Sequence, residues 1–125
     1  PSEIGRLTGL TRLDLYRNEL TGPIPSELAQ LTAFTEDMFL HINQLTGSIP
    51  LQLWRLTALV GLVLFDNQLT GQIPTELGGF TALANLILDN NTLTGPIPSE
   101  LGKLTTLAAL HLYNNELTGP IPSEL

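Results

Sequence analysis

The chain has 125 residues, carries 12 acidic against 5 basic side chains, and contains no cysteine. Its net charge of −7 argues against nucleic-acid binding, which requires clustered Lys and Arg to neutralise phosphates. The lack of cysteine excludes a disulfide framework and a thiolate metal site, and the longest apolar run, residues 58–65, is too short to cross a bilayer. With 42% hydrophobic residues, we expect a folded segment that neither inserts into a membrane nor binds nucleic acid.

Five Ile-Pro pairs mark an internal repeat. Their prolines are Pro25, Pro50, Pro74, Pro98 and Pro122, which are 25, 24, 24 and 24 residues apart. Self-similarity at a fixed period predicts one array of stacked units: 1–24, 25–49, 50–73, 74–97, 98–121 and the partial unit 122–125. Bare ends of such a stack expose apolar surface, so we expect the array to continue in a longer chain or to dock at its ends.

Each unit is predicted to contain a short helical turn followed by a strand. The Pro-Ser-Glu-Leu segments are expected to begin the turns, with Ser26 or Ser99 as the N-cap and Glu27 or Glu100 at the positive end of the dipole. The strands are indicated by two apolar columns spaced by two residues, because side chains at that spacing share one face. These columns are Leu13, Met38, Leu62, Leu86 and Leu110, and Leu15, Leu40, Leu64, Leu88 and Leu112.

Asparagine and glycine columns follow the strands. An inward amide carries both donor and acceptor, so we expect each asparagine to satisfy backbone groups at the bend. The glycines are expected at turns where a Cβ would clash. The two columns are Asn18, Asn43, Asn67, Asn91 and Asn115, and Gly22, Gly47, Gly71, Gly95 and Gly119.

This pattern resembles the plant-type subclass of the leucine-rich repeat family, whose unit runs Leu-x-x-Leu-x-x-Leu-x-Leu-x-x-Asn-x-Leu-Thr-Gly-x-Ile-Pro. The stretch from Leu83 through Asn91 and Gly95 to Pro98 shows it plainly. The resemblance implies an α/β fold: a right-handed solenoid with a parallel sheet on its concave side and short 3₁₀ or α turns on its convex side. It also implies a second short strand near each Leu-Thr-Gly segment and an extracellular recognition module.

The second unit contains one extra residue, because Phe34 to Asn43 spans nine steps where Leu10 to Asn18 spans eight. Alignment back from Asn43 places Met38 and Leu40 in the core. We therefore predict a local bulge within residues 35–37, where the chain enters the strand.

Residues between and after the core leucines are expected to face solvent as a contiguous apolar and aromatic surface on the concave side. We predict that this surface binds a protein or peptide, with aromatic anchors inside a rim of charges that includes Arg12, Asp14 and Arg17. The alternative is that aromatic and β-branched residues merely suit strands. The predicted ligand-binding residues are Tyr16, Phe39, His41, Val63, Phe65, Ile87, Asp89, His111 and Tyr113.

The convex side has one anomaly, because Trp54 stands where four other units have Gly or Ala. Leu51 lies three residues earlier, so one helical turn would place the two side by side. Either Trp54 folds over its neighbours, or Leu51 and Trp54 together contact another protein.

No catalytic site, metal site or cofactor is expected. His41 and His111 occupy different columns three units apart, and neither has a serine or carboxylate in a triad arrangement. The glutamates that recur once per unit are expected at helix starts, whereas calcium needs six or more converging oxygens.

Two further patterns bear on function. Asn90-Asn91-Thr92 is an N-glycosylation sequon, and Asn90 is expected to be exposed there, in keeping with an extracellular location. Threonine rows such as Thr21, Thr46, Thr70, Thr94 and Thr118 can match an ice lattice, although Thr also stabilises turns through backbone hydrogen bonds.

The residues and the resemblance together predict a non-enzymatic module that recognises a protein or peptide, extracellular or at the cell surface. The main alternative is a scaffold subunit of an intracellular or organellar assembly, held by its ends and by Trp54. A minor alternative is an ice-binding protein.

Overall fold

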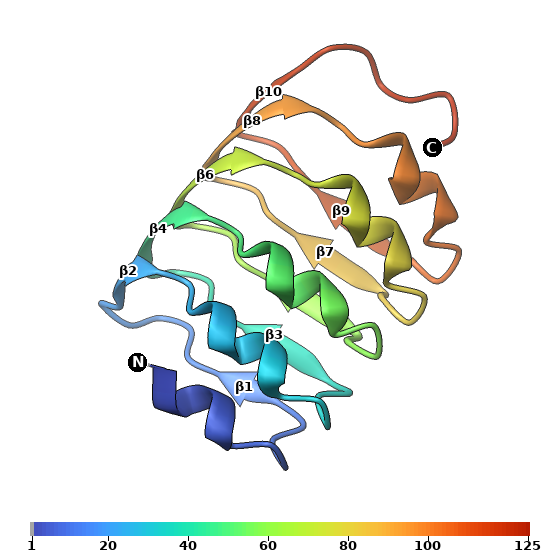
Figure 1. Cartoon of the computed structure of the whole chain (residues 1–125). Coiled ribbons are helices and arrows are strands. Elements are labelled where there is room, and N and C mark those ends of the chain that lie inside the picture. Colours follow the sequence, from blue (N-terminus) through green and yellow to red (C-terminus); the bar gives the residue numbers. More distant parts are fainter. Residues whose placement is uncertain (1) are drawn as a thin grey trace.

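The computed structural model describes residues 2–125, so Pro1, which opens the first predicted unit, lies outside it. The chain forms a solenoid in which 3₁₀ helices and pairs of strands alternate along the sequence (Figure 1). Each turn of the solenoid contributes one strand to each of two parallel sheets, and a helix connects it to the next turn.

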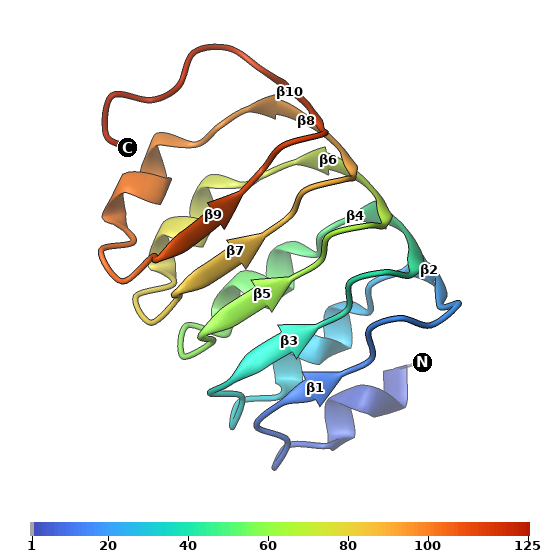
Figure 2. The same cartoon turned by 180° about the vertical axis from the view of Figure 1, so that it is seen from behind.

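The first sheet has the order β1-β3-β5-β7-β9, and Figure 2 shows it in front of the helices. Its strands pair in parallel, with Leu13 opposite Met38 and Leu62 opposite Leu86, so the predicted core column is confirmed. The strands are β1 (Leu13–Asp14), β3 (Asp37–Phe39), β5 (Gly61–Val63), β7 (Asn85–Ile87) and β9 (Ala109–His111).

The second sheet has the order β10-β8-β6-β4-β2 and contains the Leu-Thr-Gly segments, as the resemblance implied. Thr46 pairs with Gln68, not with Thr70, so equivalent residues of neighbouring units are offset in this sheet. The equivalent threonines of the predicted row, such as Thr46 and Thr70, therefore do not face one another, although Thr70 is paired with Thr92 of the next strand. The strands are β2 (Thr21–Pro23), β4 (Gln44–Ser48), β6 (Gln68–Gln72), β8 (Thr92–Pro96) and β10 (Glu116–Thr118).

The helical turns of the described residues are all 3₁₀ helices of five residues: η1 (Ser2–Arg6), η2 (Ser26–Gln30), η3 (Leu51–Arg55), η4 (Thr75–Gly79) and η5 (Ser99–Lys103). The predicted serine N-caps are wrong. Pro25 and Pro98 occupy the N-cap positions and have no side chain that can accept a hydrogen bond. Ser26 consequently lies inside the first turn, where its Oγ bonds the Glu27 carboxylate at 3.3 Å.

The interior is a continuous column of leucine with two phenylalanines. Phe34 and Phe80 are completely buried, and so are Met38 and Leu64. Burial decreases at the two ends, where Leu7 is 54% and Ile121 is 78% exposed. The packing that stabilises one repeat is therefore supplied by the repeats on either side of it.

The asparagine column forms the predicted ladder of hydrogen bonds. The Asn43 Nδ2 donates to the carbonyl oxygens of Leu40 at 3.1 Å and Leu15 at 2.9 Å, and its Oδ1 accepts from the backbone N–H of Leu20 at 3.0 Å. Asn67, Asn91 and Asn115 repeat this arrangement. Each asparagine thus satisfies backbone groups of its own repeat and of the repeat before it.

The extra residue of the second repeat is accommodated just before β3, within the predicted segment. The chain bends at Glu36, and the backbone N–H groups of Thr35 and Glu36 both donate to the Thr11 carbonyl, at 3.4 and 3.1 Å. Met38 and Leu40 are buried, as the alignment predicted. The insertion therefore leaves the register of the core unchanged.

The steric clash predicted for the glycine column is found at Gly95, where a Cβ would lie 2.8 Å from the Gln72 Cγ, but it does not explain the whole column. A Cβ built on Gly22 meets no atom within 4 Å, yet Gly22 has a φ of +80°. All five glycines of the column have positive φ. They are required by the left-handed backbone conformation, in which a Cβ is strained whatever the space around it.

Candidate ligand-binding surface

Two rows of side chains cover the outer face of the first sheet, which we call the concave face. The strand register pairs Asp14 with Phe39, Phe39 with Val63, Val63 with Ile87 and Ile87 with His111, which confirms the first predicted row. The second row lies just beyond the strands and contains Tyr16, His41, Phe65, Asp89 and Tyr113. Backbone hydrogen bonds hold it in register, such as Ile42 N–H to the Phe65 carbonyl.

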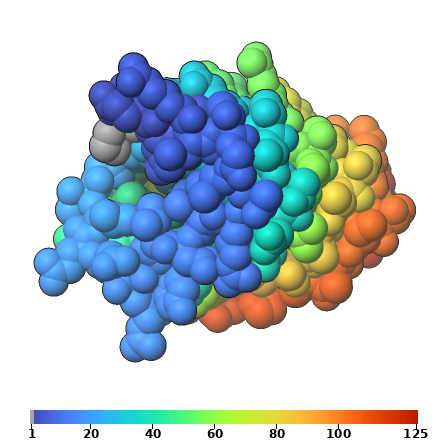
Figure 3. All heavy atoms as spheres, turned by 90° about the horizontal axis from the view of Figure 1, so that it is seen from below, coloured from blue at the N-terminus to red at the C-terminus, as the bar shows by residue number. Residues whose placement is uncertain are grey.

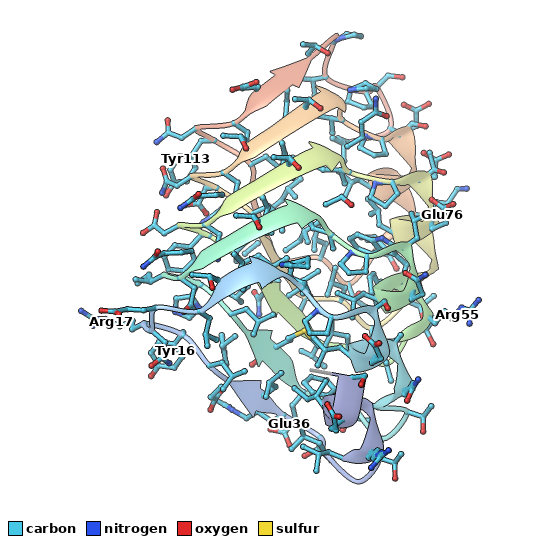
Figure 4. All side chains as sticks on the ribbon, turned by 60° about the vertical axis from the view of Figure 1, so that its left-hand side comes forward. Tyr16, Arg17, Glu36, Arg55, Glu76 and Tyr113 are labelled. Carbon is cyan, nitrogen blue, oxygen red and sulfur yellow. The ribbon has the colours of Figure 1, made fainter. Side chains whose placement is uncertain are left out.

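Figure 4 shows Tyr16, Arg17 and Tyr113 projecting on one side of the solenoid, opposite Arg55 and Glu76 of the helical side. The two tyrosines come from repeats far apart in sequence. Because the repeats stack in register, their second-row side chains face the same direction.

Four rings form an aromatic cluster, defined here as Tyr16, Phe39, His41 and Phe65. His41 is sandwiched, with its ring centroid 4.7 Å from that of Tyr16 and 4.4 Å from that of Phe65, at interplanar angles of 5° and 20°. Phe39 contacts His41 edge-on at 5.8 Å. Such stacked and edge-to-face contacts are favourable beyond their buried area, so the cluster is held together without a ligand.

Arg12 is fixed at the edge of the aromatic cluster. Its Nε donates to both carboxylate oxygens of Asp14, at 3.1 and 2.9 Å, and its Cζ lies 5.0 Å from the centroid of the Phe39 ring. Hydrogen bonding to Asp14 is the main cause that raises the pKa of Arg12. The predicted charged rim is therefore partly neutralised at this end, whereas Arg17 is exposed.

Burial lowers the pKa of His41, and this effect outweighs the opposing charges of Asp66 and Asp14. Its Nδ1 is buried and has no hydrogen-bond partner among the described residues. The neutral imidazole is therefore the form that the aromatic cluster favours.

Asp89 and Val63 were expected to be exposed, and the structure shows that both are buried. Val63 is 8% exposed because it is the central residue of its row, with Phe39 and Ile87 on the flanking strands. Asp89 is 2% exposed. Its Oδ2 accepts a hydrogen bond from the Asn90 amide at 3.1 Å, while its Oδ1 lies 3.9 Å from the His111 Nδ1.

Tyr113 borders the same carboxylate. Asp89 raises the pKa of Tyr113, first because its carboxylate attracts the proton of the nearby phenol, and then because burial and the negative charge of Asp89 disfavour a phenolate. Tyr113 remains 58% exposed, so it is available to a ligand while it covers part of Asp89.

Asn90 is half-buried, in contrast to the exposed side chain expected for the glycosylation sequon. Its amide donates to Asp89, and its Oδ1 accepts from the Asn114 Nδ2 at 2.7 Å. Sequence analysis did not find this link between Asn90 and Asn114. The available signal was that asparagine occupies equivalent positions in two adjacent repeats, where both residues adopt a positive φ that Asn tolerates better than most residues.

Of the two alternatives for Trp54, the structure supports folding over its neighbours and argues against a convex contact, because this side chain is only 5% exposed. It packs edge-on against Phe80 of the next repeat, with centroids 5.3 Å apart. Most other units are limited to small residues here by the close approach of the next turn: a Cβ on Gly102 would lie 2.5 Å from the Glu124 carbonyl oxygen. Leu51 is 59% exposed, so it does not form an exposed pair with the buried Trp54.

Among residues 2–125, no group of three His, Cys, Asp or Glu side chains is placed to hold a metal ion, and no helix has the length and hydrophobicity needed to cross a membrane. A hollow of about 440 Å³ opens at the amino-terminal end of the stack (Figure 3). It is lined mainly by core leucines and isoleucines and lies away from the two rows.

Comparison with known proteins identifies the family. The family model named Leucine Rich Repeat matches residues 9–31, 58–80, 82–104 and 106–125, which is more than half of the chain. The chain therefore belongs to the leucine-rich repeat family. The matched segments omit residues 32–57, which contain the extra residue and Trp54. No sequence among curated proteins matches the chain.

Solved structures of plant receptors are similar to this chain over nearly its whole length. The ectodomain of the Arabidopsis thaliana membrane receptor kinase GASSHO1/SCHENGEN3, in complex with CASPARIAN STRIP INTEGRITY FACTOR 2, is 41% identical over 99% of this chain and 15% of its own, with a TM-score of 0.96. The Arabidopsis receptor kinase HAESA, in complex with the peptide hormone IDA and the co-receptor SERK1, is 41% identical over 100% of this chain and 21% of its own, with a TM-score of 0.94.

The BIR3–SERK2 complex from Arabidopsis thaliana supplies a third match, 43% identical over 90% of this chain and 60% of the matched chain, with a TM-score of 0.86. The present chain spans only part of each of these proteins. These matches support the plant-type leucine-rich repeat solenoid that the sequence resemblance implied.

Proposed function

We propose that the chain is a non-enzymatic recognition module that binds a protein or peptide through its concave face. The observation that carries this proposal is the aromatic cluster, whose rings are already stacked and in register before any ligand is present. A preorganised surface loses little side-chain entropy on binding, and aromatic side chains are the residues that most often dominate binding energy.

The exposure pattern agrees with this proposal. Tyr16 is 45% and Tyr113 is 58% exposed, and they stand at opposite ends of the second row, with the less exposed His41 and Phe65 between them. A ligand lying along the row would contact both tyrosines and cover the stacked rings. The scaffold alternative is weakened because Trp54, its proposed contact, is buried.

Similarity to plant receptors supports both the ligand class and the location. The matched GASSHO1/SCHENGEN3 and HAESA ectodomains were solved with a peptide or protein ligand, and HAESA also with a co-receptor. By analogy, we assign this chain to the extracellular part of a membrane receptor or of a related secreted protein.

The test is selection of binders from a displayed library of random short peptides against the purified chain. The selected peptides should bind a variant with Tyr16→Ala and Phe65→Ala at least about tenfold more weakly, which corresponds to about 1.4 kcal/mol. A matched variant with Arg55→Ala and Glu76→Ala changes two exposed residues of the helical side and should bind normally. Peptides that bind both variants and the parent chain equally would contradict the use of the concave face.

A further inference from the structure

Asp89 is a buried carboxylate with one oxygen left unpaired. The residue is 2% exposed, and its Oδ1 has no hydrogen-bond partner among the described residues. Buried polar atoms are nearly always hydrogen-bonded, and an unpaired buried charge is costly. Such an oxygen can accept a hydrogen bond from a ligand.

The orientation of this carboxylate is set by a chain of amides. The Asn114 Nδ2 donates to the Asn90 Oδ1 at 2.7 Å, and the Asn90 Nδ2 donates to the Asp89 Oδ2 at 3.1 Å. With Oδ2 occupied, Oδ1 is the oxygen available to a new donor. The His111 Nδ1 is the nearest basic atom, but its distance of 3.9 Å is too long for a hydrogen bond.

The surroundings of Asp89 suit an organic cation. In the second row Asp89 lies between Phe65 and Tyr113, and the hydrogen bonds from Asp66 N–H to the Asp89 carbonyl and from Asn90 N–H to the Tyr113 carbonyl fix this order. Aromatic faces attract guanidinium and ammonium groups. Tyr113 and His111 are both more than half exposed on their outer sides, so rotation of either side chain can open Oδ1 to a ligand.

The charge of the carboxy-terminal half of the chain also favours a positively charged ligand. After Arg55 the sequence contains one basic residue, Lys103, and six acidic residues; Glu76 and Glu100 lie on the helical side with Lys103, whereas Asp66 and Asp89 lie on the concave side. At the other end of the second row stands the exposed Arg17. An extended ligand with a positive group near Asp89 would therefore meet a complementary potential at this end.

We propose that Asp89, with Phe65 and Tyr113 on either side of it in the second row, receives the guanidinium or ammonium group of an arginine or lysine side chain of a peptide ligand; we call these three residues the cation site. The cation donates to the Asp89 Oδ1 and lies against the two aromatic rings. This inference rests on the proposed function and specifies the ligand chemistry at one end of the concave face.

The test uses the peptides selected from the displayed library, together with versions in which each arginine is replaced by the neutral isostere citrulline and each lysine by norleucine. One arginine or lysine position should be enriched, and its neutral replacement should weaken binding about tenfold or more. Asp89→Asn should cause the same loss and should remove most of the difference between the charged and neutral peptides. Asp66→Asn removes the same charge from an exposed neighbour and serves as the matched control, with an effect of less than about threefold.

A second variant keeps the test decisive if Asp89→Asn alters the local structure. His111→Lys places an amine beside Asp89 Oδ1, so it should compete with the ligand cation, weaken binding and raise the midpoint of urea unfolding. Peptides that require Tyr16 and Phe65 but bind equally with and without the positive charge would overturn the cation site and leave the proposed function intact. Peptides indifferent to Tyr16, Phe65 and Asp89 alike, or no selected peptides, would overturn both.

Discussion

The imidazole ring of His41 lies 4.4 Å from the phenyl ring of Phe65, measured between centroids, although the two residues belong to adjacent repeats. Tyr16 covers the opposite face of the same imidazole. The stack therefore couples three repeats on the concave face and places a titratable group at its centre.

Acid should weaken the fold through His41. Its pKa is lowered in the folded state by burial, so the unfolded chain, with a His pKa of about 6.5, binds the proton more readily. The stability contributed by neutral His41 is fully present above that value and is lost as pH falls through the lower folded pKa. Urea unfolding at about pH 8 and about pH 5 should show a smaller acid loss for His41→Phe, which keeps the stack. An identical loss in both proteins would contradict this prediction.

The asparagine ladder should be most costly to break in the middle of the stack. Asn91→Ala leaves the buried Leu69 N–H without its partner and removes one of the two amide donors to the Leu64 carbonyl, which keeps Asn67, so we expect a loss of about 2–4 kcal/mol in unfolding free energy. Asn18→Ala is the control, because the exposed Asn18 amide donates only to carbonyls of its own repeat, and its loss should stay below about 1.5 kcal/mol. Denaturant unfolding of both variants provides the measurement, and equal losses would count against the ladder.

Trp54 should behave as a core residue. Trp54→Ala removes its contact with Phe80 and should cost about 3–5 kcal/mol. Trp54→Phe keeps a ring and also removes the buried, unpaired indole N–H, so it should cost less than about 1.5 kcal/mol. Tryptophan fluorescence of the parent chain should resist quenching by iodide until the protein unfolds. Ready quenching in the native state would show that the side chain is exposed.

Substitution of two glycines can distinguish the effect of backbone conformation on stability from the effect of the space available for a side chain. A Cβ meets nothing within 4 Å at either Gly22 or Gly9, but only Gly22 has a positive φ, of +80°. Gly22→Ala should therefore cost about 1–2 kcal/mol, whereas Gly9→Ala should be close to neutral. Thermal or urea unfolding of the two variants provides the comparison, and similar values would show that φ is not the deciding factor.

The periodic sequence predicted the parts of the fold that depend on repetition. The spacing of leucines assigned Met38 and Leu40 to the core despite the extra residue before them, because burial of one face leaves a strand only one acceptable register. The order of the second row was predictable for the same reason. Position within the unit also indicated that each asparagine would bond backbone groups.

Features that depend on individual neighbours were not predictable from the period. Asp89 occupies the same column as the exposed Tyr16, and its burial depends on flanking side chains such as His111 and Tyr113. The direction taken by Trp54 depends on Phe80 of the following repeat. Local rules also favoured Ser26 as an N-cap, but the proline before it takes that position.

The hydrogen bonds of the asparagine ladder all run in the same direction along the solenoid. From Asn43 onward, each asparagine Oδ1 accepts a hydrogen bond from a backbone N–H of the preceding repeat. Each repeat therefore depends on the repeat that follows it for an acceptor. Removing repeats from the amino-terminal end leaves a side-chain Oδ1 such as that of Asn91 without its donor, and a side chain can turn toward water. Removing repeats from the carboxy-terminal end instead leaves a fixed backbone N–H such as that of Leu93 without its acceptor. Shortened versions of equal length should therefore differ in stability according to which end was cut.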